Sequence, residues 1–327
     1  HSRGLTISGS DVEETKITKA ERAMGVTVYL EHDAAHLGDA QLVVYSAAIH
    51  DENPELKAAR ARGIPAVERS VMLGYVSRMY SHSVCVSGTH GKTTTTSLIY
   101  RILRDAGMNV ALGGNIGESF AYSVATGEYD WYVLELSSFQ LDGMYRFRAH
   151  IGVLTNITPD HLDRYDHCFQ NYVDAKMRIT QNMTSRDFFI YSGDDEVIWQ
   201  QLPKYDLRMK QLPFAARNAV ASGAGDAFLC DGSFTATVGQ TSVEIDTAKL
   251  RIKGLHNAYN AMAAALAALA AGVSPDVVRQ SLYGFEPVEH RLEPVAEKGG
   301  VLWINDSKAT NVDSVYYALE SMTRPVV

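Results

Sequence analysis

Apolar and polar residues alternate along the chain with two different periods, and these periods predict a multidomain α/β fold. In the first 80 residues, short apolar runs alternate with segments whose apolar residues recur every three or four positions. The expected strands are 5–8, 26–30, 42–46 and 64–67, and the expected helices are 17–24 and 54–62. This βαβ rhythm predicts a parallel, Rossmann-like sheet. Such a sheet opens with a strand and a glycine-rich turn, so we expect that opening piece to be missing.

The middle of the chain predicts a second, larger α/β unit. A strand at 83–86 leads into a glycine-rich loop and a helix, and this part is expected to hold a parallel sheet. Later elements are expected to be strands at 131–136, 151–156 and 188–191, a smaller β-sheet within 227–252, a buried alanine-rich helix at 258–273 and a helix at 275–280. A third unit then begins with a hairpin reaching Trp303-Ile304 and a helix reaching Met322. The expected domains are therefore 1–79, 80–288 and 289–327, the last being only the beginning of a domain.

Composition and charge narrow the class of protein. The 327 residues are 46% hydrophobic and 21% charged, which is typical of a globular protein. A formal net charge of −8 argues against a broad basic surface, so no nucleic-acid partner is expected. The sequence has no signal peptide and no membrane-spanning run, so we expect no membrane insertion and a cytoplasmic location. Cys85, Cys168 and Cys230 are far apart, which predicts neither a zinc site nor disulfides, and Cys85 is expected in the core.

The strongest chemical signal is a glycine-rich loop between a strand and a helix. Its sequence is Gly88-Thr89-His90-Gly91-Lys92-Thr93-Thr94. Backbone N–H groups and the helix N-terminus favour phosphate there, Lys92 suits the β- and γ-phosphates, and the Thr93 hydroxyl suits Mg²⁺. The strict Walker pattern has a glycine where this chain has Val86, so the loop is a shortened variant. The alternative interpretation is a glycine turn that only caps a helix.

Polar residues follow two further expected strands. Glu135 ends an apolar strand, and a carboxylate at the carboxyl end of a parallel strand is a natural Mg²⁺ ligand. His161 follows the next strand and could bind a metal or position a substrate. Lys176 lies on the helix after it. Taken alone, each has a plainer interpretation: an exposed strand end, a structural histidine and a surface lysine.

Two later segments also carry candidate ligands. Asn257 and Asn260 lie three residues apart at the start of a helix, where amides can read a nucleobase or ribose, although Asn257 could instead cap the helix. Arg291, Asp306 and Lys308 follow the expected domain boundary, where they could close over a triphosphate. A local salt-bridged surface is the alternative for that group.

Taken together, the ordered motifs resemble the Mur ligase family. The motifs are GTHGKT at 88–93, GGNIG at 113–117, LELSSFQL at 134–141, TPDHLDR at 158–164, an alanine–lysine pair at 175–176, HNAYN at 256–260, HR at 290–291 and NDSKATN at 305–311. The resemblance runs from about residue 4 to the end. It implies a UDP-binding first domain, a central ATPase domain and a carboxyl-terminal amino-acid-binding domain.

The resemblance also implies a chemistry and a role for each residue. ATP would activate a carboxylate as an acyl phosphate, which an amine then attacks, with two Mg²⁺ ions screening the charges. The implied catalytic residues are Lys92, His161, Lys176 and Lys308. The implied ATP-binding residues are Gly88, Thr89, His90, Gly91, Lys92, Thr93, Thr94, Asn257, Asn260, Arg291 and Asp306. The implied metal ligands are Thr93, Glu135, His161 and a carbamylated Lys176, and the implied substrate contacts are Asp11, Ser46, Asn115, Ser137, Gln140 and Thr310.

The substrate pair depends on which half of the chain is weighted. From about residue 109 the motifs resemble members that add D-glutamate to a UDP-muramoyl-L-alanine precursor. Before about residue 96 they resemble members that add L-alanine, as in Ser8-Gly9-Ser10-Asp11, which leaves a chimera possible. Because the later domains meet the reacting groups, D-glutamate addition by a monomer is expected. The rivals are L-alanine addition, a folylpolyglutamate synthase-like enzyme and a non-catalytic nucleotide-binding fragment.

Overall fold

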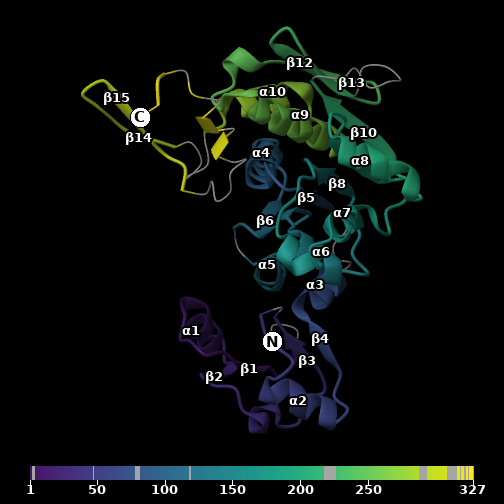
Figure 1. The fold of residues 1–327 in the computed structure, drawn as a ribbon, viewed down its shortest axis with the longest axis vertical. Helices are drawn as coiled ribbons and strands as arrows, with labels where there is room; N and C mark the ends of the chain where they lie inside the picture. The colour runs from purple at the N-terminus through teal and green to yellow at the C-terminus, as the bar shows by residue number, and fades with distance from the viewer. Residues whose placement is uncertain are drawn as a thin grey trace.

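The computed structural model describes most of the chain in separate stretches. These are residues 1, 4–46, 48–77, 82–117, 119–216, 226–286, 293–307, 315–316, 318–319, 322 and 324–326. The described residues form a mixed α/β protein dominated by one large, mostly parallel sheet, which confirms the predicted fold class. Figure 1 shows the amino-terminal unit at the bottom, the large sheet with its helices from the middle to the top, and a hairpin at the upper left.

The amino-terminal unit follows the predicted βαβ rhythm. Its elements are β1 Ser8–Ser10, α1 Lys16–Ala23, β2 Thr27–Tyr29, a 3-10 helix Ala34–Leu37, β3 Val43–Tyr45, α2 Pro54–Ala61, β4 Ala66–Glu68 and α3 Arg69–Ser77. The strand pairing is parallel, as predicted, with Ser8 opposite Thr27 and Val43 opposite Ala66. Within the described residues the strands form two separate pairs, β1–β2 and β3–β4, instead of one sheet.

The central sheet has nine strands in the order β13-β12-β11-β10-β9-β8-β5-β7-β6 within the described residues. Their bounds are β5 Ser83–Ser87, β6 Val110–Gly114, β7 Trp131–Glu135, β8 Ile151–Leu154, β9 Phe188–Ser192, β10 Lys210–Ala215, β11 Ala227–Cys230, β12 Ser233–Val238 and β13 Thr241–Asp246. Strands β5 to β11 are parallel, and β12 and β13 are antiparallel. The prediction of a smaller sheet within 227–252 is wrong. Phe214 of β10 pairs with Ala227 of β11, so the strands of this stretch continue the large sheet.

Helices cover both faces of this sheet. The helices are α4 Lys92–Asp105, α5 Phe120–Thr126, α6 Ser138–Gly143, α7 Phe169–Met177, α8 Glu196–Gln201, α9 Leu255–Ala270 and α10 Pro275–Gly284, with 3-10 turns at Leu162–Tyr165, Arg178–Thr180, Leu202–Lys204 and Thr247–Lys249. Val84 and Val86 pack with α4, α9 and α10, whereas Cys85 packs with α6 and α7. This alternation is the period-two pattern of a strand buried on both faces. It confirms that Cys85 is a core residue.

The carboxyl-terminal hairpin pairs β14 Glu293–Lys298 with β15 Val301–Asn305. It matches the hairpin expected to reach Trp303-Ile304. The helix expected to reach Met322 falls largely outside the described residues. Within the described part of the chain, no helix has both the length and the apolar character needed to cross a bilayer.

An ion pair between the half-buried Arg148 and the buried Asp187 connects the segments where β8 and β9 begin. Arg148 donates from Nε to Asp187 Oδ2 at 3.0 Å and from Nη2 to Oδ1 at 2.9 Å. The Thr184 hydroxyl donates to the same carboxylate at 2.9 Å. Burial tends to raise the pKa of Asp187, but the hydrogen bonds from Arg148 and Thr184 and the Arg148 charge outweigh it, so the pKa is lowered.

Asp187→Asn is expected to lower the free energy of unfolding at neutral pH by about 2 kcal/mol, since charged hydrogen bonds to a buried group are lost. A lowered folded-state pKa stabilises the protein above the unfolded-state pKa, and this contribution disappears as the pH falls through the folded-state value. Urea unfolding of both proteins should therefore show a gap that shrinks below about pH 3.9. A gap that stays constant into acid would assign the effect to packing instead.

Candidate functional site

The glycine-rich loop lies where the buried strand β5 ends and α4 begins. Gly88 has φ +143° and Gly91 has φ +80°, conformations that strongly favour glycine. A Cβ at Gly88 would lie 1.9 Å from Thr155 Oγ1, and one at Gly91 would lie 2.4 Å from Asn260 Oδ1. Both glycines therefore permit close contact with segments far away in sequence.

The segment after β8 holds the loop in place. Asn156 Oδ1 accepts from the His90 N–H at 2.8 Å, Asn156 Nδ2 donates to His90 O at 3.1 Å, and Asn156 O accepts from the Thr89 N–H at 2.9 Å. Two loop N–H groups are thus already used within the protein. An anion would instead meet the N-terminus of α4, which begins at Lys92, because a helix N-terminus directs backbone N–H groups and positive potential at a ligand. The sequence predicted only that residue 156 ends a strand, although a polar residue at the end of a buried strand is the signal that could have identified Asn156.

Two lysine amines converge on one carbonyl of the loop. Lys92 Nζ donates to Gly88 O at 2.9 Å and to Thr89 O at 2.8 Å, while Lys176 Nζ donates to Gly88 O at 2.6 Å. The Lys176 residue is 2% exposed, so its interpretation as a surface lysine is wrong. Burial, and then the charge of Lys92, hold the pKa of the Lys176 amine well below its usual value, although Asp160 acts in the opposite direction. Two cations this close favour a polyanionic ligand or a chemical change at one amine.

A hydroxyl pair connects the loop to the helix that carries Lys176. The Thr89 and Tyr172 hydroxyls lie 3.1 Å apart. Thr89 Oγ1 donates to Thr158 O at 3.1 Å and accepts from the Thr158 N–H at 3.0 Å. The Tyr172 ring also lies under the Lys176 amine, with 4.6 Å between Nζ and the ring centroid. Sequence reasoning assigned no role to Tyr172, because its partners are distant in the chain.

Glu135 ends β7 with a buried carboxylate. Its residue is 2% exposed, so the exposed-strand-end interpretation is wrong. Oε1 accepts from Asn115 Nδ2 at 3.1 Å, whereas Oε2 is buried and has no hydrogen-bond partner among the described residues. An unpaired buried carboxylate oxygen is costly unless it meets a cation. The Glu135 carboxylate therefore suits a hard divalent ion bound with a nucleotide, for which Thr93 remains the other predicted ligand.

His161 sits in the loop after β8 with φ +50°. Its side chain is 56% exposed, its Nε2 lies 3.7 Å from Asp160 Oδ2, and its ring lies 5.3 Å from the ring of Phe139. The described residues contain no group of three or more His, Cys, Asp or Glu side chains arranged for a metal. A second ion at His161 would therefore need ligands from a substrate or from a modified Lys176.

The start of α9 packs directly against the glycine-rich loop. Asn260 Oδ1 accepts from Thr95 Oγ1 at 3.1 Å, and Asn260 Nδ2 donates to Asn257 Oδ1 at 3.1 Å. The cap of α9 is Gly254, so the interpretation of Asn257 as the helix cap is wrong. Asn257 Nδ2 instead donates to Lys253 O at 2.8 Å. The side-chain amides of Asn257 and Asn260 thus lie beside the glycine-rich loop and form one side of the candidate site.

Two of the expected substrate contacts have a structural role. Ser137 and Gln140 form a capping box at the start of α6, in which the Gln140 N–H donates to Ser137 Oγ at 3.3 Å and the Ser137 N–H donates to Gln140 Oε1 at 3.0 Å. The helix they cap begins at Ser138, three residues after Glu135. Because both residues lie close to Glu135 in the sequence, a substrate contact by Ser137 and Gln140 remains a prediction.

Asp11 and Ser46 lie at comparable places in the amino-terminal unit. Each directly follows a parallel strand, β1 for Asp11 and β3 for Ser46. Asp11 Oδ1 accepts from the Val12 N–H at 2.7 Å, and Ser46 Oγ accepts from the Ala48 N–H at 3.2 Å. The carboxyl ends of parallel strands are the usual ligand edge of such sheets, so their predicted role remains compatible with the fold.

The remaining predicted residues belong to the last segment. Asp306 is half-buried just after β15, and the neighbouring Asn305 Nδ2 donates to Glu293 Oε2 at 3.2 Å across the hairpin. Arg291, Lys308 and Thr310 lie outside the described residues. Closure of Arg291 and Lys308 over a triphosphate and substrate contact by Thr310 therefore remain predictions.

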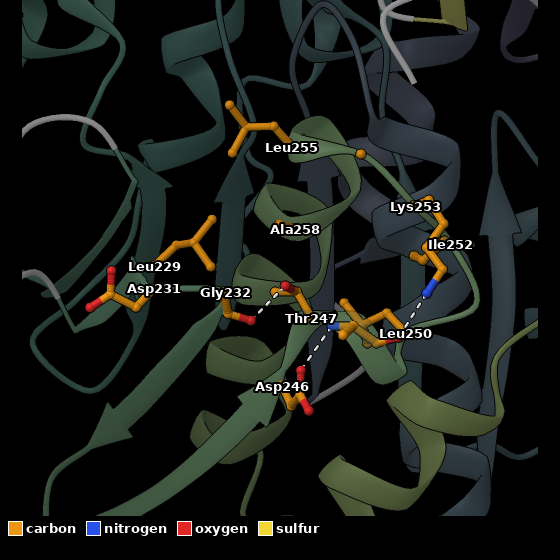
Figure 2. Close-up of a pocket in the computed structure, with 12 residues that line it drawn as sticks. Leu229, Asp231, Gly232, Asp246, Thr247, Leu250, Ile252, Lys253, Leu255 and Ala258 are labelled. Carbon is orange, nitrogen blue, oxygen red and sulfur yellow. Dashed lines mark hydrogen bonds between the residues drawn. The ribbon is translucent and has the colours of Figure 1, made fainter. Parts of the chain in front are cut away.

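A separate cavity of about 430 Å³ opens beside the start of α9 (Figure 2). Its lining includes the apolar residues Leu250, Ile252 and Ala258 and the charged residues Asp246 and Lys253. Asp246 caps the following 3-10 turn through the Ala248 N–H, and Lys253 Nζ donates to Ala248 O. None of the predicted site residues lines this cavity, although Asn257 Nδ2 donates to the carbonyl of Lys253, which does.

Comparison with protein-family models gives two matches. The Mur ligase middle domain matches residues 86–268, more than half of the chain, and the Mur ligase family catalytic domain matches residues 1–81. The first match includes the glycine-rich loop, Glu135, His161, Lys176 and both amides of α9.

Curated relatives match nearly the whole chain. A UDP-N-acetylmuramoylalanine–D-glutamate ligase of Bacteroides fragilis is 46% identical over 296 residues, which cover 90% of this chain and 65% of the relative. The corresponding ligase of Bacteroides thetaiotaomicron is 47% identical over 289 residues, which cover 88% of this chain and 64% of the relative. The chain thus spans slightly less than two thirds of these relatives' length. Because only about a tenth of the chain is unmatched, these matches extend into the first 96 residues.

Solved structures share the fold at lower sequence identity. The UDP-N-acetylmuramate–alanine ligase MurC of Thermotoga maritima is 24% identical with a TM-score of 0.65, covering 98% of this chain and 72% of that structure. The MurF ligase of the same organism, solved with ADP, is 17% identical with a TM-score of 0.60, covering 98% of this chain and 73% of that structure. These likenesses show the shared architecture alone.

Proposed function

The chain belongs to the Mur ligase family, and from this premise we propose that it is part of an ATP-dependent ligase of peptidoglycan precursor synthesis. The proposed reaction adds D-glutamate to UDP-N-acetylmuramoyl-L-alanine through an acyl phosphate. The observation that carries the proposal is the convergence of Lys92 and Lys176 on Gly88 O, beside the N-terminus of α4. Glu135 lies on the neighbouring strand β7, opposite Val86 of β5. This arrangement concentrates positive potential where a triphosphate would lie.

Each residue at the loop contributes one physical function to this proposal. Lys92 would exchange its hydrogen bonds to Gly88 O and Thr89 O for contacts with the β- and γ-phosphates. Glu135 and Thr93 would hold Mg²⁺, which supplies charge neutralisation when the nucleotide is bound. Asn115 holds Glu135 in one orientation through its 3.1 Å hydrogen bond. Asn257 and Asn260 would contact the nucleotide, with Asn260 fixed by Thr95.

A carbamate on Lys176 is the second part of the proposal. The amine is buried and its pKa is lowered, so a share of it carries the nitrogen lone pair that can react with CO₂. The product is an anion, which removes the repulsion between Lys176 and Lys92 and provides a carboxylate ligand. With His161, it would serve a second Mg²⁺ near the reacting carboxylate.

The choice of D-glutamate rests on the relatives, which are named as D-glutamate ligases at 46% and 47% identity. Addition of L-alanine to UDP-N-acetylmuramate is the competing assignment, and Ser8-Gly9-Ser10-Asp11 in the first domain favours it. UDP is common to both substrates. The choice between the two reactions therefore depends on the last domain and on recognition of the muramoyl end of the substrate.

Phosphate release from ATP, measured on the protein that carries this chain, tests the assignment. One reaction contains UDP-N-acetylmuramoyl-L-alanine with D-glutamate, and the other contains UDP-N-acetylmuramate with L-alanine. We expect release only with the first pair. Release only with the second pair would transfer the assignment to L-alanine addition, and release with neither pair would favour a nucleotide-binding role without ligation.

A further inference from the structure

Ser87, the last residue of β5, has a buried hydroxyl without a partner. The residue is 0% exposed, and its Oγ has no hydrogen-bond partner among the described residues. Leaving a hydroxyl unpaired in the interior costs free energy, and such groups are rare in folded proteins. The unpaired hydroxyl of Ser87, next to the glycine-rich loop, therefore indicates that a polar group of a ligand or a modified side chain forms a hydrogen bond with it.

The position of Ser87 shows which group this hydroxyl can meet. Ser87 shares its face of β5 with Cys85, because side chains two apart on a strand point to the same side. Cys85 and Leu154, the register partner of Ser87, both belong to the apolar layer under α7. Lys176 Nζ reaches the same place from α7, since it donates to the carbonyl of the next residue, Gly88. The unpaired hydroxyl and the buried amine thus lie on the same side of β5, the first on Ser87 and the second against the carbonyl of the adjacent Gly88.

We propose that Ser87 is a positioning residue that donates a hydrogen bond to a carbamate on Lys176. This inference rests on the proposed function, which places a carbamate at Lys176. The lone pair of the neutral amine nitrogen forms a bond to the carbon of CO₂, the electron pair of one C=O π bond moves onto its oxygen to give the carboxylate, and one N–H proton leaves to water. The new carboxylate extends beyond Nζ and needs donors, and Ser87 Oγ–H is an unused donor in the same layer. The hydroxyl would both stabilise the carbamate and fix its orientation.

The test measures the carbamate itself. The chain is equilibrated with ¹³C-bicarbonate, and the ¹³C NMR signal of the lysine carbamate is followed as bicarbonate increases, with Lys176→Ala identifying the signal. Ser87→Ala is expected to raise the bicarbonate concentration for half-maximal signal by about tenfold or more, the equivalent of losing a hydrogen bond to a charged group. Ser87→Thr keeps a hydroxyl and should restore the signal.

Ser83→Ala is the matched control. Ser83 lies on the same strand and face as Ser87 and is also buried, but it is at the opposite end of β5. It should leave the bicarbonate dependence unchanged, and circular dichroism should show that each variant is folded. A Ser87→Ala signal equal to that of the unchanged chain would overturn the role of Ser87 while leaving ligation intact. Absence of any carbamate signal in the unchanged chain would overturn the inference and the carbamate part of the proposed function, whereas phosphate release tests the ligase assignment separately.

Discussion

Lys92→Met is expected to lower the rate of ATP-dependent phosphate release by about a hundredfold to a thousandfold, because it removes a charged donor aimed at the transferred group. The length of the side chain is nearly kept while the charge is lost. In the structure, Lys92 Nζ donates to Gly88 O and Thr89 O, so the amine lies against the loop that is proposed to bind the phosphates. Steady-state kinetics and calorimetric ATP titration would separate slower chemistry from weaker nucleotide binding.

Two further variants make this result specific. Lys92→Arg keeps the charge but replaces a compact ammonium with a planar fork, so it should recover only part of the activity. Lys57→Met removes an exposed lysine that pairs with Glu52 on the amino-terminal unit, and it should leave the rate unchanged. Full activity of Lys92→Met would mean that the loop does not contact the transferred phosphate, and the proposed mechanism would then be wrong.

The strands buried on both faces could be predicted from the sequence. β5, β7, β8 and β9 are near-continuous apolar runs, as central parallel strands usually are. β6 and β10 were missed, because β6 ends in Gly113-Gly114 and β10 contains Pro213, residue types that are depleted in strands. The joining of β10 to β11 was also missed, since a pairing between distant segments leaves no local signal.

The site was predictable only where its chemistry is local. The glycine-rich loop could be identified because its glycines, lysine and threonines are adjacent in sequence. The burial of Lys176 depends on a contact with Gly88, 88 residues away, so composition alone suggested a surface lysine. The structural role of Ser137 and Gln140, by contrast, was readable, because a serine followed three residues later by glutamine is the capping-box pattern.

Gly88→Ala is expected to lower the free energy of unfolding by about 3 kcal/mol or more and to abolish most nucleotide binding. Two costs add together: a non-glycine residue at positive φ costs about 1–2 kcal/mol, and overpacking of a buried site costs about 1–3 kcal/mol. The second cost arises because the new methyl group would lie 1.9 Å from Thr155 Oγ1, whose own hydrogen bond to His90 O at 2.6 Å holds the loop. Urea unfolding and ATP titration of the variant measure both effects.

Gly239→Ala separates backbone strain from the steric clash. Gly239 has φ +62° in the turn between β12 and β13, but a Cβ there would meet no atom within 4 Å. This control should lose only about 1 kcal/mol of stability and keep its nucleotide affinity. Gly91→Ala should fall between the two, because its methyl group would meet the amide end of Asn260, which can turn aside only by giving up its bond to Thr95. Equal losses in all three variants would mean that strain alone matters, and that the close contact of the loop with Thr155 and Asn260 does not determine its shape.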